Sequence, residues 1–150
     1  MILTSSAFGE GAIIPEKFSC KGRDVSPPLS WAEVPAGVIS FALICDDPDA
    51  PGGTWDHWLY YDIPGETREL NEAVPKDEGP APGGEQGHNS WRQSGYRGPC
   101  PPGGTHRYVF KLFALDILLG LGPGANKNAL FGAMKGHILE QTQLMGRFSR

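Results

Sequence analysis

Two short segments of the sequence carry most of the side chains that can do chemistry. The first, 46–51, reads Asp-Asp-Pro-Asp-Ala-Pro and is soon followed by His57. The second, 98–108, reads Gly-Pro-Cys-Pro-Pro-Gly-Gly-Thr-His-Arg-Tyr, and its His106 and Tyr108, two residues apart, share one face of an extended strand. Because proline fixes φ, both segments are expected to be stiff loops that lose little entropy when they hold a ligand.

If the two loops converge, one cavity holds carboxylates, two imidazoles and a phenol. Such a set offers donors to phosphoryl or carboxylate oxygens and acceptors to an ammonium group, so it suits a small anionic or zwitterionic ligand. Taken singly, each segment also has a simpler interpretation, in which the carboxylates only bond their own backbone and His57 only packs. The residues expected to contribute polar groups are Asp47, Asp49, His57, His106 and Tyr108.

Other chemistries fit the same residues less well. Two histidines and an aspartate can bind a metal ion, but neither loop has a local metal-ligand spacing, and we assign no metal site. A pocket histidine, oriented by Asp47, can act as a general base in ester hydrolysis. The cluster offers Cys100 as its one nucleophile candidate and has neither a nucleophile elbow nor a P-loop ending. We therefore assign no catalytic residue, and ester hydrolysis ranks below binding.

The two loops must be positioned by regular elements, and the pattern favours strands. Segments rich in β-branched and aromatic residues, or alternating in polarity, are expected as strands at 39–45, 58–63 and 107–116. Dense Gly, Pro and Asp predict loops at 46–53, 75–90 and 98–105. The loop at 75–90 is long enough to act as a recognition surface.

Near the C-terminus the spacing changes to that of a helix. We expect this helix to run from about 127 to 145, with Asn126 as its N-cap and Gly146 as its stop. Gly132 and Gly136 weaken it by about 1 kcal/mol each, so it must dock on the sheet. The apolar stripe consists of Leu130, Met134, Ile138, Gln141 and Met145.

Size and charge limit the class of protein. The chain has 150 residues, which predicts a single domain over 1–150, of all-β or α+β class. The net charge of -4, with no basic run, argues against nucleic acid as a partner. The apolar run at 40–45 is too short to span a membrane.

The N-terminus and the cysteines bear on location. The first residues lack a basic region followed by an apolar core, so we expect a cytoplasmic protein. The three cysteines, at 20, 45 and 100, are an odd number without metal-ligand spacing. This pattern favours reduced thiols, with one long-range disulfide as the open alternative.

The order and spacing of these motifs resemble the phosphatidylethanolamine-binding protein (PEBP) family, specifically its bacterial and archaeal branch, often called Raf kinase inhibitor-like. The two loops look like the signatures of that family, and the resemblance runs nearly end to end. It also covers Ser26-Pro27-Pro28-Leu29-Ser30-Trp31, His57-Trp58, Gln86-Gly87-His88-Asn89-Ser90 and 133–139.

The resemblance implies a mainly β fold, an antiparallel β-sandwich with peripheral helices and a small anion pocket at one end. It implies binding of phosphate, acetate or a phosphoethanolamine-like head group without a cofactor, and a homodimer, since bacterial relatives often pair. Inhibition of a protease or kinase is an alternative that some relatives suggest. Asp56 stands where animal relatives have a histidine, which would make the entrance more acidic. By position, the residues implied to line the pocket are Asp47, Asp49, His57, His106 and Tyr108, with Trp55, Pro101 and Pro102 as walls and Cys100 at the rim.

Protonation of the two pocket histidines would favour anions. We therefore expect binding to weaken as the pH rises through the histidine range.

Overall fold

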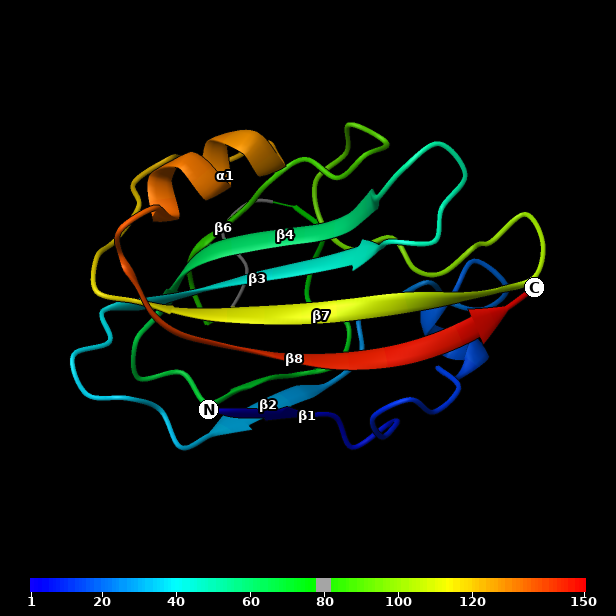
Figure 1. Ribbon diagram of the computed structural model, residues 1–150, viewed down its shortest axis with the longest axis horizontal. Helices are drawn as coiled ribbons and strands as arrows, with labels where there is room; N and C mark the ends of the chain where they lie inside the picture. The colour runs from blue at the N-terminus through cyan, green and yellow to red at the C-terminus, as the bar shows by residue number, and fades with distance from the viewer. Residues whose placement is uncertain (78–81) are drawn as a thin grey trace.

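The computed structural model describes residues 1–77 and 82–150. Two antiparallel sheets face each other, and a short helix covers the outer face of the larger one (Figure 1). The three-stranded sheet has the order β1-β2-β5, formed by Ile2–Thr4, Leu29–Ala32 and Glu69–Leu70. The five-stranded sheet has the order β6-β4-β3-β7-β8, formed by Glu85–Gln86, Trp55–Pro64, Ser40–Asp47, Thr105–Leu115 and Ile138–Ser149. The helices are the 3₁₀ turn η1, Glu16–Phe18, and α1, Lys127–Met134.

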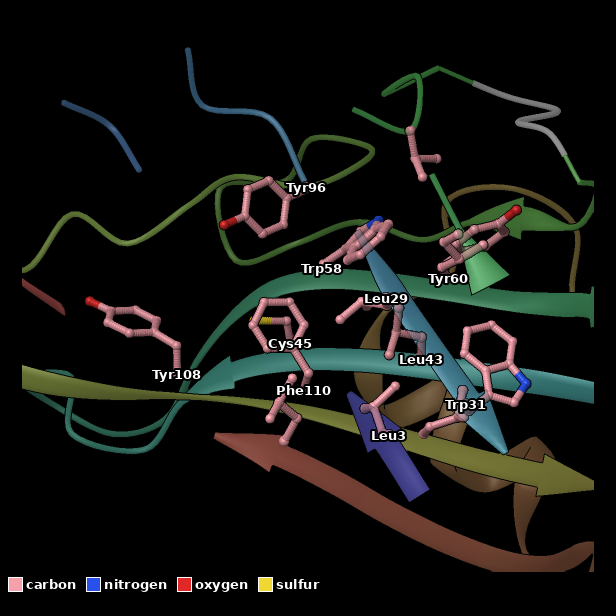
Figure 2. Packing of buried hydrophobic residues seen from close by; sticks show 14 of the residues in the cluster. Leu3, Leu29, Trp31, Leu43, Cys45, Trp58, Tyr60, Tyr96, Tyr108 and Phe110 are labelled. Atoms are coloured by element: carbon pink, nitrogen blue, oxygen red, sulfur yellow. The ribbon is translucent and has the colours of Figure 1, made fainter. Parts of the chain in front are cut away.

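The three strands predicted from composition are confirmed as β3, β4 and β7. β3 is central, so every residue from Ser40 to Asp47 is buried, which explains its unbroken apolar run. Its side chains alternate between two cores. Phe41, Leu43 and Cys45 face the smaller sheet, and Ala42 and Ile44 face α1. Figure 2 shows the first of these cores, where side chains of β3, β4 and β7 pack against Leu3, Leu29 and Trp31.

The prediction of a helix over 127–145 is wrong beyond its first two turns. Asn126 does cap α1, accepting a hydrogen bond from the Ala129 amide at 2.9 Å, but the helix ends at Met134. Gly136 then takes a φ of 83°, which turns the chain out of the helix, and β8 begins at Ile138.

The residues beyond Gly136 alternate with a period of two as well as fitting a helical spacing. Leu144, Gly146 and Phe148 are buried one after another on the face of β8 that meets the core. Gly146 is therefore not a helix stop. A side-chain carbon there would lie 2.5 Å from the Cγ1 of Ile14, so glycine lets the N-terminal segment cross the strand.

The expected loop at 75–90 contains the short strand β6, which pairs with β4. Residues 78–81, in the middle of the proposed recognition surface, lie outside the described residues. In the described part of the chain, no helix is long and apolar enough to cross a bilayer.

Candidate functional site

The ends of three strands meet at one end of the larger sheet. Because β3 is antiparallel to both β4 and β7, its last residues lie beside the first residues of its neighbours. Asp47 pairs with Trp55 on β4, and Asp46 pairs with Val109 on β7. The loops 48–54 and 98–104 leave the sheet at this same end, at the right of Figure 1. The two loops predicted to converge from the sequence therefore do so.

A β-bulge helps to place His57. Cys45 pairs with Trp58 and Asp46 with Asp56, which leaves His57 as the extra residue of β4. Strict alternation would put His57 and Trp58 on opposite faces, yet both are buried on the side of Cys45. The bulge explains how the imidazole reaches the cavity while the adjacent indole stays in the core.

The loops and strand ends enclose a cavity of about 300 Å³. Of the nine residues predicted for the site, eight line it: Asp47, Trp55, His57, Cys100, Pro101, Pro102, His106 and Tyr108. Ala50, Pro51 and Trp91 complete the lining. Asp49 is the predicted residue that does not reach the cavity.

Asp47 and His106 form a buried pair on the cavity floor. The Nδ1 of His106 lies 2.7 Å from the Oδ2 of Asp47, and the two residues are 7% and 3% exposed. The other carboxylate oxygen of Asp47 accepts the Asp49 amide at 2.8 Å. Since an ionised carboxylate can only accept, Nδ1 of His106 carries the shared proton, and Nε2 is the nitrogen left for a ligand.

Asp49, on the same loop, does not line the cavity and binds Arg107 instead. Its carboxylate accepts two hydrogen bonds from the Arg107 guanidinium, at 2.9 and 2.8 Å, and a third from the Arg107 amide at 2.9 Å. The hydrogen bonds with Arg107 lower the pKa of Asp49 from 3.8 to about 2. Asp49 thus ties the loop after β3 to β7, next to His106, and positions the site without lining it.

His57 has a different environment from His106. Its Nδ1 lies 2.6 Å from the backbone carbonyl of Arg97, which can only accept, so Nδ1 carries a proton. The ring meets the rings of Trp91 and Tyr108 edge-on, with centroids 5.0 and 5.2 Å away. Burial lowers the pKa of His57 below its ordinary value, despite the nearby Asp47 charge. The lowered pKa makes the charged form of His57 less favourable. The expectation that both histidines are charged when an anion binds therefore does not hold for His57.

The hydroxyl of Tyr108 is the unsatisfied group of the cavity. Tyr108 is 1% exposed, and its hydroxyl makes no hydrogen bond of normal geometry to the described residues, although the Asp47 carboxylate and the Cys100 backbone lie close enough to affect its pKa. In Figure 2 this hydroxyl points away from the packed side chains around Cys45 and Phe110. Burial, together with the charge of Asp47, raises the pKa of Tyr108, so the phenol keeps its proton and can donate.

Trp91 is the cavity residue outside both predicted loops that sequence reasoning missed. Asn89, which is buried, holds the turn that carries it, because its Oδ1 accepts the amides of Trp91 and Gln93 at 2.9 and 3.2 Å. The indole packs edge-on against Trp55, with the Arg97 guanidinium 4.6 Å from its ring centre. The segment 86–90, which lies directly before Trp91, could have indicated this residue, because the turn at Asn89 positions the residues that follow it.

A disulfide fastens the cavity wall, so the prediction of reduced thiols is wrong. Cys20 and Cys100 are bonded, with their Cα atoms 5.4 Å apart and a sequence separation of 80. The Cys20 amide donates to the Pro99 carbonyl at 3.0 Å, and the Gly98 amide donates to Asp24 at 2.7 Å. Cys100 is thereby removed as a nucleophile. Cys45 is a buried free thiol whose pKa is raised by burial.

The acidic residues next to Asp47 face away from the cavity. Asp46 is 1% exposed, and its Oδ2 accepts from Lys111 at 3.0 Å and from Lys127 at 2.9 Å. Lys127 also donates to Asp56 at 2.8 Å. The expectation that Asp56 makes the entrance more acidic is therefore wrong, because its charge is neutralised on the α1 side of the sheet.

The arrangement offers hydrogen bonds more readily than metal ligands. In residues 1–77 and 82–150, no group of three His, Cys, Asp or Glu side chains is placed to hold a metal ion. Asp47 already accepts on both oxygens, and each histidine has one nitrogen bound. What remains for a ligand is the second nitrogen of each ring and the phenol.

The sequence matches one protein family and is similar to several relatives. The family described as phosphatidylethanolamine-binding protein matches residues 4–149. A UPF0098 protein of Methanothermobacter thermautotrophicus is 49% identical over 151 residues, which cover 100% of this chain and 99% of the relative. A UPF0098 protein of Aquifex aeolicus is 48% identical, covering 100% of this chain and 89% of the relative.

Solved structures agree in fold. A crystal structure of a PEBP homolog from Chlamydia trachomatis is 40% identical, with a TM-score of 0.91 over 99% of this chain and 96% of the other. The structure of YbcL from E. coli, described as a new member of the mammalian PEBP family, is 28% identical. Its TM-score is 0.92, over 99% of this chain and 97% of the other.

Proposed function

The chain belongs to the phosphatidylethanolamine-binding protein family, in its bacterial and archaeal branch, and from this premise we propose that its cavity binds a small oxyanion. The ligand class comprises phosphate, a phosphorylated head group such as phosphoethanolamine, or a carboxylate. The protein then acts as a binding or regulatory module rather than through turnover.

One observation carries this proposal: the hydroxyl of Tyr108 is buried at the cavity, and no described residue forms a hydrogen bond of normal geometry with it. A buried hydroxyl without a hydrogen bond costs about 1–3 kcal/mol, and a bound oxygen removes that cost. His106 lines the same cavity with its Nε2 left over, and its Asp47 partner fixes the ring. Donors held in place before binding spend little entropy on it.

Isothermal titration with phosphate, phosphoethanolamine and acetate tests the proposal. We expect wild-type protein to bind at least one of them and His106→Ala to lose detectable binding. Tyr108→Phe should keep its thermal stability, because it removes an unsatisfied group, and bind about tenfold more weakly. His137→Ala is the matched control, since His137 makes a similar pair with Asp116, 2.8 Å long, outside the cavity.

Unchanged affinity in His106→Ala would mean that the anion binds elsewhere. A wild type that binds none of the three anions would refute the proposal and favour a role for the loops in contacts with a protein, as in inhibition of a protease or kinase.

Hydrolysis is a second candidate, favoured by the Asp47–His106 pair alone. A carboxylate 2.7 Å from Nδ1 orients an imidazole as it would orient a general base toward water. Because Cys100 is in a disulfide, a bound water is the nucleophile that this mechanism would use. Incubation with p-nitrophenyl phosphate and p-nitrophenyl acetate decides it: release of p-nitrophenol that disappears in His106→Ala supports hydrolysis, and release at the buffer rate excludes it for these esters.

A further inference from the structure

The two histidines of the cavity are held by different kinds of partner. His106 is held by a carboxylate, whereas His57 is held by a backbone carbonyl and aromatic edges. In both rings Nδ1 is the bonded nitrogen, so Nε2 is the atom that each can offer to a ligand. What Nε2 offers depends on whether the ring carries a second proton.

His57 is set up to accept. Its Nδ1 proton is committed to the Arg97 carbonyl, and no carboxylate among the described residues hydrogen-bonds to the ring. The ring is 3% exposed and contacts Trp91 and Tyr108 edge-on, surroundings that solvate an extra charge poorly. In the neutral ring with a protonated Nδ1, Nε2 is a lone-pair acceptor.

His106 and Tyr108 are set up to donate. With Asp47 accepting from Nδ1, the His106 ring can donate to a bound anion through a proton on Nε2. The phenol of Tyr108 donates its proton as well. No lysine or arginine among the described residues lines the cavity, so hydrogen bonds from the cavity side chains must account for the recognition of the anion.

Resting on the proposed function, we infer that the cavity selects an oxyanion that still carries an acidic O–H, such as hydrogen phosphate. Two of its oxygens accept from His106 and Tyr108, and its O–H donates to the Nε2 of His57. An anion of the same size without that proton leaves the lone pair of Nε2 facing an oxygen lone pair. His57 is thus a specificity-determining residue.

Titration of wild-type protein with two matched pairs of anions tests this inference. At about pH 8 phosphate and sulfate both carry two negative charges and have similar size, but phosphate retains one O–H. Arsenate and selenate form a second, larger pair with the same difference. A buried acceptor that meets no donor costs about 1–3 kcal/mol, so phosphate and arsenate should bind at least about tenfold more tightly than their partners.

Two variants assign the effect. His57→Gln, whose amide can donate or accept, should bring phosphate and sulfate within about threefold of each other. His106→Gln should weaken both anions by similar factors and keep their ratio. Equal wild-type affinity for phosphate and sulfate would overturn the inference while leaving the proposed function intact. Failure to bind any of the four would instead count against the proposed function. Because the anion pairs are compared on wild-type protein, the test stands even where a variant does not fold.

Discussion

Opening the Cys20–Cys100 disulfide should cost the protein a large part of its stability. The bond joins residues separated by 80 positions, and the chain-entropy relation for a closed loop of that length gives roughly 4.5 kcal/mol at 25 °C. Domains are typically stable by only about 5–15 kcal/mol, so the loss is severe. The wall of the cavity at Cys100 should also loosen, which would weaken phosphate binding.

Urea unfolding of the oxidised protein and of a Cys20→Ala/Cys100→Ala variant measures the effect. With a slope of about 2 kcal/mol/M for a chain of this size, the midpoint should fall by about 2 M in the variant. Counting thiols in the denatured protein is the control. One thiol, from Cys45, should react before reduction and three after it.

Three reactive thiols in freshly purified protein, or equal midpoints for both proteins, would refute this reasoning. The result also bears on the proposed cytoplasmic location. Disulfides are rare in the cytosol outside hyperthermophiles, so a stable bond would favour an oxidising compartment or a hyperthermophilic host.

Three further predictions follow from the contacts around the cavity. Lys127→Ala, which leaves two carboxylates short of a partner, should lower the free energy of unfolding by about 1–2 kcal/mol in urea, and an unchanged midpoint would show that solvent already screens them. Arg107 lowers the pKa of Asp49 from 3.8 to about 2, so this pair stabilises the folded state above pH 4, and the stabilisation is lost as the pH falls toward 2. Acid unfolding followed by circular dichroism should accordingly show a steeper loss over that range for wild type than for Asp49→Asn, whereas identical curves would contradict the pairing. Trp91→Ala removes a ring packed against His57 and should weaken phosphate binding roughly fivefold in titration calorimetry, an effect that is absent if the indole only covers the surface.

Much of the cavity could be predicted from the sequence because its residues lie in two short, proline-stiffened loops at strand ends. The strands β3, β4 and β7 are buried on one or both faces, so their apolar residues are dense and visible. Eight of the nine predicted residues consequently fall on one cavity. The sequence could not show that Asp47 lines the cavity and Asp49 does not. The two carboxylates differ in their partners, which are His106 for Asp47 and Arg107 for Asp49.

The errors arose where two physical patterns coincide or where partners are far apart. The segment 138–149 fits a helical stripe and an alternating strand equally, and hydrogen bonding along β7 decides between them. A single glycine, Gly136, separates the two outcomes. The disulfide left no local signal, since its cysteines lie 80 residues apart and the chain holds an odd number of them.

Because of the bulge in β4, the geometry of the site depends on the number of residues in the strand as well as on their identities. His57 is the extra residue opposite β3, so its direction depends on how many residues lie between the loop and Trp58 as well as on their identities. A one-residue deletion at Asp56 would remove the bulge and turn this imidazole to the other face, with every site side chain still present in the sequence. Substitution scanning would not detect this dependence, whereas insertions and deletions would. Transfer of the site to another sheet has to carry the spacing with the residues.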